Sequence, residues 1–366
     1  MSAFEWKRAV IKVGSALIAP SGSQCSATYL LPIAQFISAS HALGKEVIIV
    51  SSGSVAAGRD QIPVHHRATI AEKQAMAAIG QTQMMANWQR FFDRPCAQIM
   101  LTYDDLRDRT RYVNIKNTLG ELLKHNAIPI VNENDTVAVN ELQVGDNDNL
   151  AAYTALVAQA DTLIICSDID GLYTADPRKD PSAQLIPKVN KIDEALFAIA
   201  GGAGSAVGTG GMFTKLQAAQ KCMQSGIQTL IVNGKKADIF DALRQGQSPG
   251  TLFIPDQSAN KARQLWLTHT LTSCGAISID SGAYHALSSK GASLLPSGIL
   301  KVSGHFNVGD AVDITHDNNV IGKGLALLNN DDLQRIKGLQ GEQAASVLGY
   351  AFGPEVVHRD DMVILK

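Results

Sequence analysis

Two segments in the middle of the chain concentrate carboxylate and amide side chains. The first is Asn132-Glu133-Asn134-Asp135, and the second, ten residues further on, is Gly145-Asp146-Asn147-Asp148-Asn149. An unpaired ion in an apolar core would cost several kcal/mol or more, so these side chains need polar surroundings. We expect them to face a ligand, a metal ion or water.

Two lysines stand where the chain could bind an anion. Lys12 ends an apolar run and is followed by Gly14 and Ser15, where a glycine lets backbone N–H groups approach an anion. Lys215 closes the glycine-rich segment 208–215, which leads into a helical pattern whose N–H groups and dipole attract phosphate. The structural alternatives are a lysine extending into solvent and a flexible hinge.

A further polar segment, Ser167-Asp168-Ile169-Asp170-Gly171, follows a β-branched run. It fits a plain turn and a nucleotide contact about equally well. Together, the lysines, glycine-rich loops and carboxylates are typical of phosphoryl transfer, in which cations offset the phosphate charge and positioning supplies most of the rate. No side chain stands out as a general base. The chain contains no G-x-x-x-x-G-K-[ST] and no G-x-G-x-x-G after the first strand, so neither a P-loop nor a dinucleotide fold is expected.

These motifs must be positioned by alternating strands and helices. Strands are predicted at 10–13, 47–50, 99–102, 128–132, 162–166 and 229–232, and helices at 28–40, 71–92, 110–125, 150–159 and 214–224. The alternation favours an α/β fold with a mostly parallel sheet sandwiched by helices. In such folds ligands bind at the carboxyl ends of the strands, which is where the polar segments fall.

The pattern changes near residue 250. Short strand-like runs at 276–280, 298–302, 311–314 and 320–324, separated by glycine-rich turns, predict a small β-rich second domain. We predict a catalytic domain at 1–256, a linker at 257–273, and a β-rich domain with the C-terminal tail at 274–366.

Composition limits the functional classes. With 366 residues and 45% hydrophobic content the chain is long enough for two or three domains, and its net charge of −2 gives no reason to expect nucleic acid or an anionic membrane as partner. Five dispersed cysteines without a C-x-x-C pair suit free thiols in a reducing compartment. The chain shows neither a targeting segment nor the roughly 18 apolar residues of a membrane span. We expect a cytoplasmic protein.

Several independent motifs, in this order, resemble the amino-acid kinase family. They are Lys12-Val13-Gly14-Ser15, Ser51-Ser52-Gly53, Ala56-Ala57-Gly58-Arg59, Val131 to Asp135, Val144 to Leu150, Gly171 to Pro177 and Gly208 to Lys215. From about residue 275 the chain is similar to the PUA domain appended in one branch of that family. Serine stands at 51 and 167, where threonine is common in the family, and the hydroxyl is kept.

The resemblance implies ATP-dependent phosphorylation of the γ-carboxylate of L-glutamate, the first step of proline biosynthesis. A carboxylate is ionised at neutral pH, which explains the missing base. Catalytic roles are implied for Lys12, Lys215 and Asp148. Matching substrate positions are Ser52, Gly53, Asn132, Asp135, Asp146 and Asn147. Matching nucleotide positions are Lys12, Gly14, Ser15, Ser167, Asp168, Thr209, Gly210, Gly211, Met212, Phe213, Thr214 and Lys215.

The resemblance also implies a cofactor and partners. Mg²⁺ would be held through the ATP phosphates, with Asp148 orienting either the lysines or the metal, and no metal ligand is assigned. Inhibition by proline, a homo-oligomer and a glutamyl-phosphate reductase partner are further expectations.

Two alternatives stay open. Within the family, N-acetylglutamate and aspartate kinases are the nearest; an acetylated substrate has no ammonium group to pair with the acidic clusters, so a free amino acid is favoured, but spacing does not decide between glutamate and aspartate. In a different class, a PUA protein could bind RNA. Residues 274–366 carry seven basic and ten acidic residues, a net charge of −3, which disfavours contacts with phosphate.

Overall fold

The computed structural model describes residues 4–138, 147–201, 211–256, 273–350 and 352–365. Two compact units form, one mainly from residues up to 256 and the other mainly from residues after 272. The predicted linker at 257–273 lies outside the described residues apart from Ser273. In the described part of the chain no helix is long and apolar enough to cross a membrane.

An eight-stranded sheet forms the centre of the first unit. Its strands follow the order β3-β4-β2-β1-β5-β7-β8-β6, and every adjacent pair is parallel except β7 and β8. The strands are β1 Arg8–Val13, β2 Glu46–Ser51, β3 Cys96–Leu101, β4 Ile128–Glu133, β5 Thr162–Ser167, β6 Lys188–Val189, β7 Gln228–Asn233 and β8 Thr251–Phe253. The predicted, mostly parallel sheet is confirmed.

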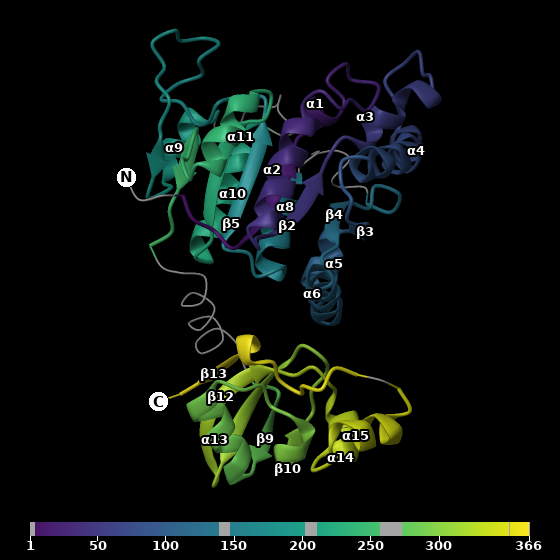
Figure 1. Cartoon of the computed structure of the whole chain (residues 1–366), viewed down its shortest axis with the longest axis vertical. Coiled ribbons are helices and arrows are strands. Elements are labelled where there is room, and N and C mark those ends of the chain that lie inside the picture. The colour runs from purple at the N-terminus through teal and green to yellow at the C-terminus, as the bar shows by residue number, and fades with distance from the viewer. Residues whose placement is uncertain (1–3, 139–146, 202–210, 257–272, 351, 366) are drawn as a thin grey trace. The chain divides into compact units, whose positions relative to one another are not determined.

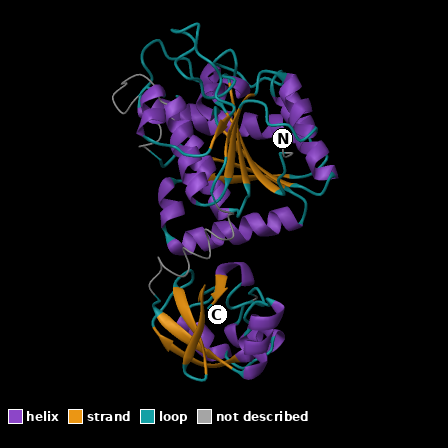
Figure 2. Cartoon of the chain, turned by 90° about the vertical axis from the view of Figure 1, so that its left-hand side faces the viewer, coloured by secondary structure: helices purple, strands orange, loops and turns teal. Residues whose placement is uncertain are grey.

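Helices lie on both sides of this sheet (Figure 2). They are α1 Ser15–Ile18, α2 Leu30–Ala42, α3 Ser54–Gly58, α4 Ile70–Gln89, α5 Tyr103–Arg107, α6 Arg109–Lys124, α8 Asn147–Val157, α9 Glu194–Ile199, α10 Met212–Gln224 and α11 Ala237–Arg244. The helix predicted at 150–159 in fact begins at Asn147. That difference places Asn147, Asp148 and Asn149 in the first turn of a helix rather than in a loop.

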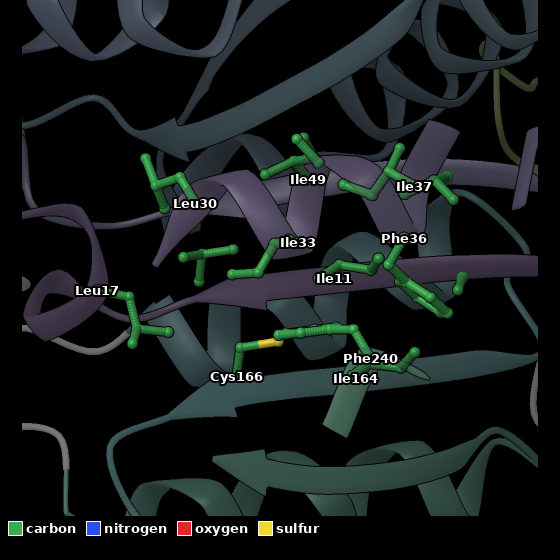
Figure 3. Close-up of a cluster of buried hydrophobic side chains, with 14 of the residues drawn as sticks. Ile11, Leu17, Leu30, Ile33, Phe36, Ile37, Ile49, Ile164, Cys166 and Phe240 are labelled. Carbon is green, nitrogen blue, oxygen red and sulfur yellow. The ribbon is translucent and has the colours of Figure 1, made fainter. Parts of the chain in front are cut away.

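Alternating side chains of the central strand β1 point to opposite faces of the sheet. Ala9, Ile11 and Val13 join the main hydrophobic core, to which α2 and α11 contribute Phe36 and Phe240, with ring centroids 5.9 Å apart. Figure 3 shows this cluster, with the α2 side chains lying against β1. Lys12 points to the other face, where it meets α8.

The second unit has a five-stranded sheet in the order β10-β9-β11-β12-β13 (Figure 1). Its strands are β9 Gly275–Ile279, β10 Ile299–Gly304, β11 Ala311–His316, β12 Asn319–Leu325 and β13 Met362–Ile364, and its helices are α13 Ser281–Lys290, α14 Asn330–Ile336 and α15 Gly341–Leu348. The four predicted strands are present. The helices were missed, although Asp280 and Asn329 cap α13 and α14 by accepting from Ala283 N and Asp332 N.

Candidate active site

The polar segments meet at the carboxyl ends of the central strands. The registers pair Val13 of β1 with Ser51 of β2 and with Cys166 of β5. In the strand order, β2, β3 and β4 all lie on one side of β1, whereas β5 pairs with the opposite edge of β1. The direction in which strands are added to the sheet therefore reverses between β1 and β5. A crevice at this switch point is the usual ligand site of an open α/β sheet.

Asp148 binds two lysines from different elements at this position. Its Oδ1 lies 2.7 Å from Lys12 Nζ, and its Oδ2 lies 3.0 Å from Lys215 Nζ. Thr214 donates a hydrogen bond of 2.8 Å to the same Oδ2. The structure therefore brings together the three residues assigned catalytic roles from the sequence, one from β1, one from α8 and one from α10.

Burial makes this cluster electrostatically unusual. Only 1% of the Asp148 side chain is exposed, and Lys12 and Lys215 are also buried. Burial alone would raise the pKa of Asp148, but the charges of Lys12 and Lys215 outweigh it and lower the pKa to about 2. Asp148 also lies in the first turn of α8, where the helix dipole favours an anion. Two cations against one carboxylate leave a positive site.

The N-terminus of α10 lies beside this cluster. Gly211 is the N-cap and provides no side-chain cap for the first N–H groups of the helix. Thr214 and Lys215 are buried, whereas Phe213 packs against Phe197 with centroids 5.4 Å apart. Thr209 and Gly210, which the sequence assigned to the nucleotide, lie outside the described residues.

The turn after β1 also differs in detail from the expectation. Gly14 donates its own N–H to Cys166 O over 3.2 Å, so that group is used in joining β1 to β5. A Cβ on Gly14 would lie 3.9 Å from Lys12 Nζ, on the side of the ammonium group. Ser15 is exposed at the start of the short helix α1. A Cβ would therefore make only ordinary van der Waals contacts there, and no close approach by itself requires glycine at this position.

A second group of residues lies between β2, β4 and α8. Asn147 Nδ2 donates to Asn132 Oδ1 over 2.8 Å and to Ser51 O over 3.2 Å. Asn132 Nδ2 in turn donates to Gln81 Oε1 over 2.9 Å. Asn132 and Asn147 are thus in contact. Gln81 was not singled out from the sequence, because nothing in a helical pattern marks which polar residue faces inward.

The loops that follow β2 and β4 are joined by a hydrogen bond beside this group of amide side chains. Gly53 has φ +95°, a conformation that favours glycine, and it is the N-cap of α3. Ser54 donates a hydrogen bond of 2.8 Å to Asp135, and Ser52 donates its N–H to Val13 O. Four of the six predicted substrate residues, Ser52, Gly53, Asn132 and Asp135, therefore follow or end adjacent strands. Asp146 lies outside the described residues.

On the β5 side, Ser167 is buried and lies 3.3 Å from the exposed Asp168. Three groups converge on the nearby Asp170: Lys236 at 2.6 Å, Asn233 at 3.0 Å and Tyr173 at 3.1 Å. Of these, Lys236 and Asn233 were missed. The hydrogen bond from Lys236 lowers the pKa of Asp170. The sequence contained a signal for Asn233 and Lys236, because the polar segment Asn233-Gly234-Lys235-Lys236 directly follows the strand predicted at 229–232.

Comparison with known proteins identifies the family. Residues 7–233 match the family model described as the amino acid kinase family, and residues 275–348 match that of the PUA domain. The chain belongs to the amino acid kinase family. It is 52% identical to the glutamate 5-kinase of Idiomarina loihiensis over 369 residues, covering all of both chains. It is also 52% identical to the glutamate 5-kinase of Salinibacter ruber, covering 98% of each chain.

Among solved structures, UMP kinase from Bacillus anthracis aligns with a TM-score of 0.47 at 17% identity, over 69% of this chain and 97% of that one. The family assignment rests on the sequence matches alone. For an amino acid kinase, the positive Lys12–Asp148–Lys215 cluster at the switch point is suited to bind and stabilise a transferring phosphoryl group.

Proposed function

We propose that this chain transfers the γ-phosphoryl group of ATP to the γ-carboxylate of L-glutamate, giving L-glutamyl 5-phosphate, the first step of proline biosynthesis. The observation that carries the proposal is the pair of buried lysines held by Asp148. The full-length similarity to glutamate 5-kinases supports the choice of substrate.

The chemistry needs no general base. A γ-carboxylate is ionised at neutral pH and can attack the phosphorus atom directly. Negative charge shared between the attacking, transferring and leaving oxygens would be stabilised by Lys12 and Lys215. Asp148 positions both ammonium groups and offsets only one of their charges. We therefore assign Asp148 as a positioning residue and the lysines as the catalytic groups.

The nucleotide would lie on the β5 and α10 side of the site. Gly14, Ser15, Ser167 and Asp168 follow or end β1 and β5, and Gly211 to Lys215 open α10. Uncapped N–H groups at the start of α10 are suited to phosphate oxygens. Met212 and Phe213 would be placed by that helix, and Thr209 and Gly210 complete the proposed set.

The amino acid would lie on the β2 and β4 side. The proposed contacts are Ser52, Gly53, Asn132, Asp135, Asp146 and Asn147. Carboxylates and amide oxygens in this set can accept hydrogen bonds from a free ammonium group, which an N-acetylated substrate lacks. This supports a free amino acid over N-acetylglutamate, and the relatives support glutamate over aspartate.

Mg²⁺ would be held in this site mainly through the phosphates of ATP. Among the described residues no three His, Cys, Asp or Glu side chains are grouped to hold a metal. Both Asp148 oxygens face lysine ammonium groups, so Asp148 is poorly placed as a ligand. Mg²⁺ commonly binds substrate phosphates with few protein ligands, and when bound it would neutralise phosphate charge.

Further parts of the proposal rest on the similarity to glutamate 5-kinases. They are feedback inhibition by proline, assembly into a homo-oligomer, delivery of the acyl phosphate to a glutamyl-phosphate reductase and a cytoplasmic location. We propose no RNA partner, because residues 274–366 carry a net charge of −3.

An acyl-phosphate assay tests the proposal. The protein is incubated with ATP, Mg²⁺ and hydroxylamine, and with L-glutamate, L-aspartate or N-acetyl-L-glutamate in parallel. We expect hydroxamate mainly from L-glutamate. In the same assay Lys12→Ala and Lys215→Ala should each lose about 100-fold or more of the turnover while remaining folded by circular dichroism. Preferred turnover of either other substrate would refute the substrate assignment, and near-normal lysine variants would refute the phosphate roles.

A further inference from the structure

A line of three side-chain amides runs from α4 to the proposed amino-acid site. Gln81 accepts from Asn132 Nδ2 over 2.9 Å, and Asn132 Oδ1 accepts from Asn147 Nδ2 over 2.8 Å. Gln81 and Asn132 are buried, with 5% and 2% of their surface exposed, whereas Asn147 is only half-buried. Asn147 is therefore the member of the line that can reach a ligand.

Two backbone groups fix the direction of these amides. The N–H of Glu133 can only donate, so the oxygen of Asn132 faces it, at 2.9 Å. The carbonyl of Ser51 can only accept, so the nitrogen of Asn147 faces it, at 3.2 Å. Both N–H groups of Asn147 are then used, one on Ser51 and one on Asn132. Its Oδ1, which has no partner among the described residues, is the atom left for a ligand.

Gln81 holds the first amide of the line in place. Its oxygen supplies the acceptor for Asn132, but its own Nε2 is buried and finds no hydrogen-bond partner in the described part of the chain. A buried donor without a partner is unfavourable, and methionine would fill the same space without one. Packing alone therefore does not account for a glutamine here, whereas the need for its oxygen does.

We infer that Gln81 is a positioning residue: through Asn132 it holds Asn147 with its oxygen toward the substrate, and that oxygen selects the α-ammonium group. A carbonyl oxygen cannot bind a carboxylate but accepts readily from an ammonium group. The inference rests on the proposed glutamate kinase function. It extends that function by naming the residue that makes the site require an amine on its dicarboxylate substrate.

The test compares L-glutamate with glutarate, which has both carboxylates and no ammonium group. For wild type, Gln81→Met and Gln81→Glu, we would measure kcat and KM for L-glutamate, KM for ATP, and the inhibition constant of glutarate against L-glutamate. In Gln81→Met we expect the KM for L-glutamate to rise about tenfold or more, as for a lost hydrogen bond to a charged group. The inhibition constant of glutarate and the KM for ATP should stay within about threefold, because neither ligand uses the ammonium contact.

Two variants control for general damage. Gln83→Met makes the same substitution on α4 at a side chain that forms no hydrogen bond with any described residue, and it should behave as wild type. Gln81→Glu keeps the acceptor, so its ratio of the glutarate constant to the L-glutamate KM should stay near that of wild type. If Gln81→Met does not fold, the ratio in Gln81→Glu decides.

Three results would overturn the inference. In Gln81→Met, the KM for L-glutamate and the inhibition constant of glutarate could rise equally, or neither could rise. In folded Gln81→Glu, the ratio of the glutarate inhibition constant to the L-glutamate KM could fall well below that of wild type. Wild type is measured first, since an enzyme inactive on L-glutamate would refute the proposed function itself. Discrimination between L-glutamate and glutarate is judged only if wild type phosphorylates L-glutamate. Failure of the proposed function and failure of this inference are therefore distinguishable.

Discussion

At the scale of single residues, Asp148 is the least replaceable group in the site. It is the carboxylate that faces both buried lysines, and it is almost fully buried itself. Removing one partner from a buried ion pair leaves an uncompensated charge and commonly costs about 3–5 kcal/mol. Asp148→Asn removes the partner of two cations at once. The same residue therefore contributes to stability and to catalysis.

The pH dependence of stability should show this role. The pKa of Asp148 is lowered to about 2 in the folded protein, below the ordinary value of 3.8. A carboxyl with a depressed pKa stabilises the fold above its unfolded pKa, and the stabilisation is lost as the pH falls through the folded pKa. We expect the difference in unfolding free energy between wild type and Asp148→Asn to be largest above about pH 4 and to shrink toward pH 2.

Urea unfolding at pH 7, 4 and 3 measures that difference. Asp168→Asn removes an exposed carboxylate nearby and serves as the control; it should change stability by less than about 0.5 kcal/mol at every pH. A gap between wild type and Asp148→Asn that is independent of pH would show that the carboxylate does not titrate as described.

At the scale of elements, α3 and α4 depend on two glycines for their close contact. A Cβ on Gly58 would lie 2.0 Å from Met76 O, and one on Gly80 would lie 1.9 Å from Ser54 O. Both are backbone atoms, so the helices would have to move apart. Ser54 holds Asp135, and Gly80 precedes Gln81, so the spacing of these helices sets the geometry of the amino-acid side of the site.

Gly80→Ala should therefore reduce stability and substrate binding together. We expect a loss of roughly 1–3 kcal/mol in unfolding free energy, as for overpacked sites, with a higher KM for L-glutamate and less effect on the KM for ATP. Gly120→Ala in α6 is the matched control, since a Cβ there meets nothing within 4 Å. It should be neutral or stabilising by up to about 1 kcal/mol, because alanine favours the helix. Equal outcomes for the two variants would contradict the close-contact explanation.

At the scale of the whole molecule, the second unit has its own sheet and its own core. Ile277, Ile314 and Leu333 are among the buried residues of that core. Its family is the PUA domain, but its sequence is acidic rather than basic. Binding to nucleic acid depends mainly on cationic contacts with phosphate, so a PUA fold does not by itself imply an RNA partner here.

Gel-shift assays on the full chain test this expectation. With tRNA and rRNA fragments at low salt, which favours electrostatic binding, we expect no shift at micromolar protein concentration. A salt-sensitive shift at that concentration would reverse the conclusion and assign the second unit a nucleic-acid role.

The fold class and the location of the site could be predicted from the sequence alone. The alternation of β-branched and helical runs predicted a mostly parallel sheet, and the polar segments at the strand ends predicted a shared ligand site. The resemblance to amino-acid kinases then implied catalytic roles for Lys12, Asp148 and Lys215. These features are readable because strand and helix periods repeat over short stretches. Element ends were less well predicted, as with the helix that begins at Asn147.

Only the tertiary structure decided which groups touch. The contact of Lys12 with Asp148 joins residues 136 positions apart, and the contact of Gln81 with Asn132 joins residues 51 positions apart. Such pairs depend on strand order and helix packing, for which the sequence carries no local signal. The same holds for Asp170 and Lys236, which meet because β5 and β7 are neighbours in the sheet. Residue type thus determined the chemistry that was possible, and packing across the sheet determined which residues can perform it.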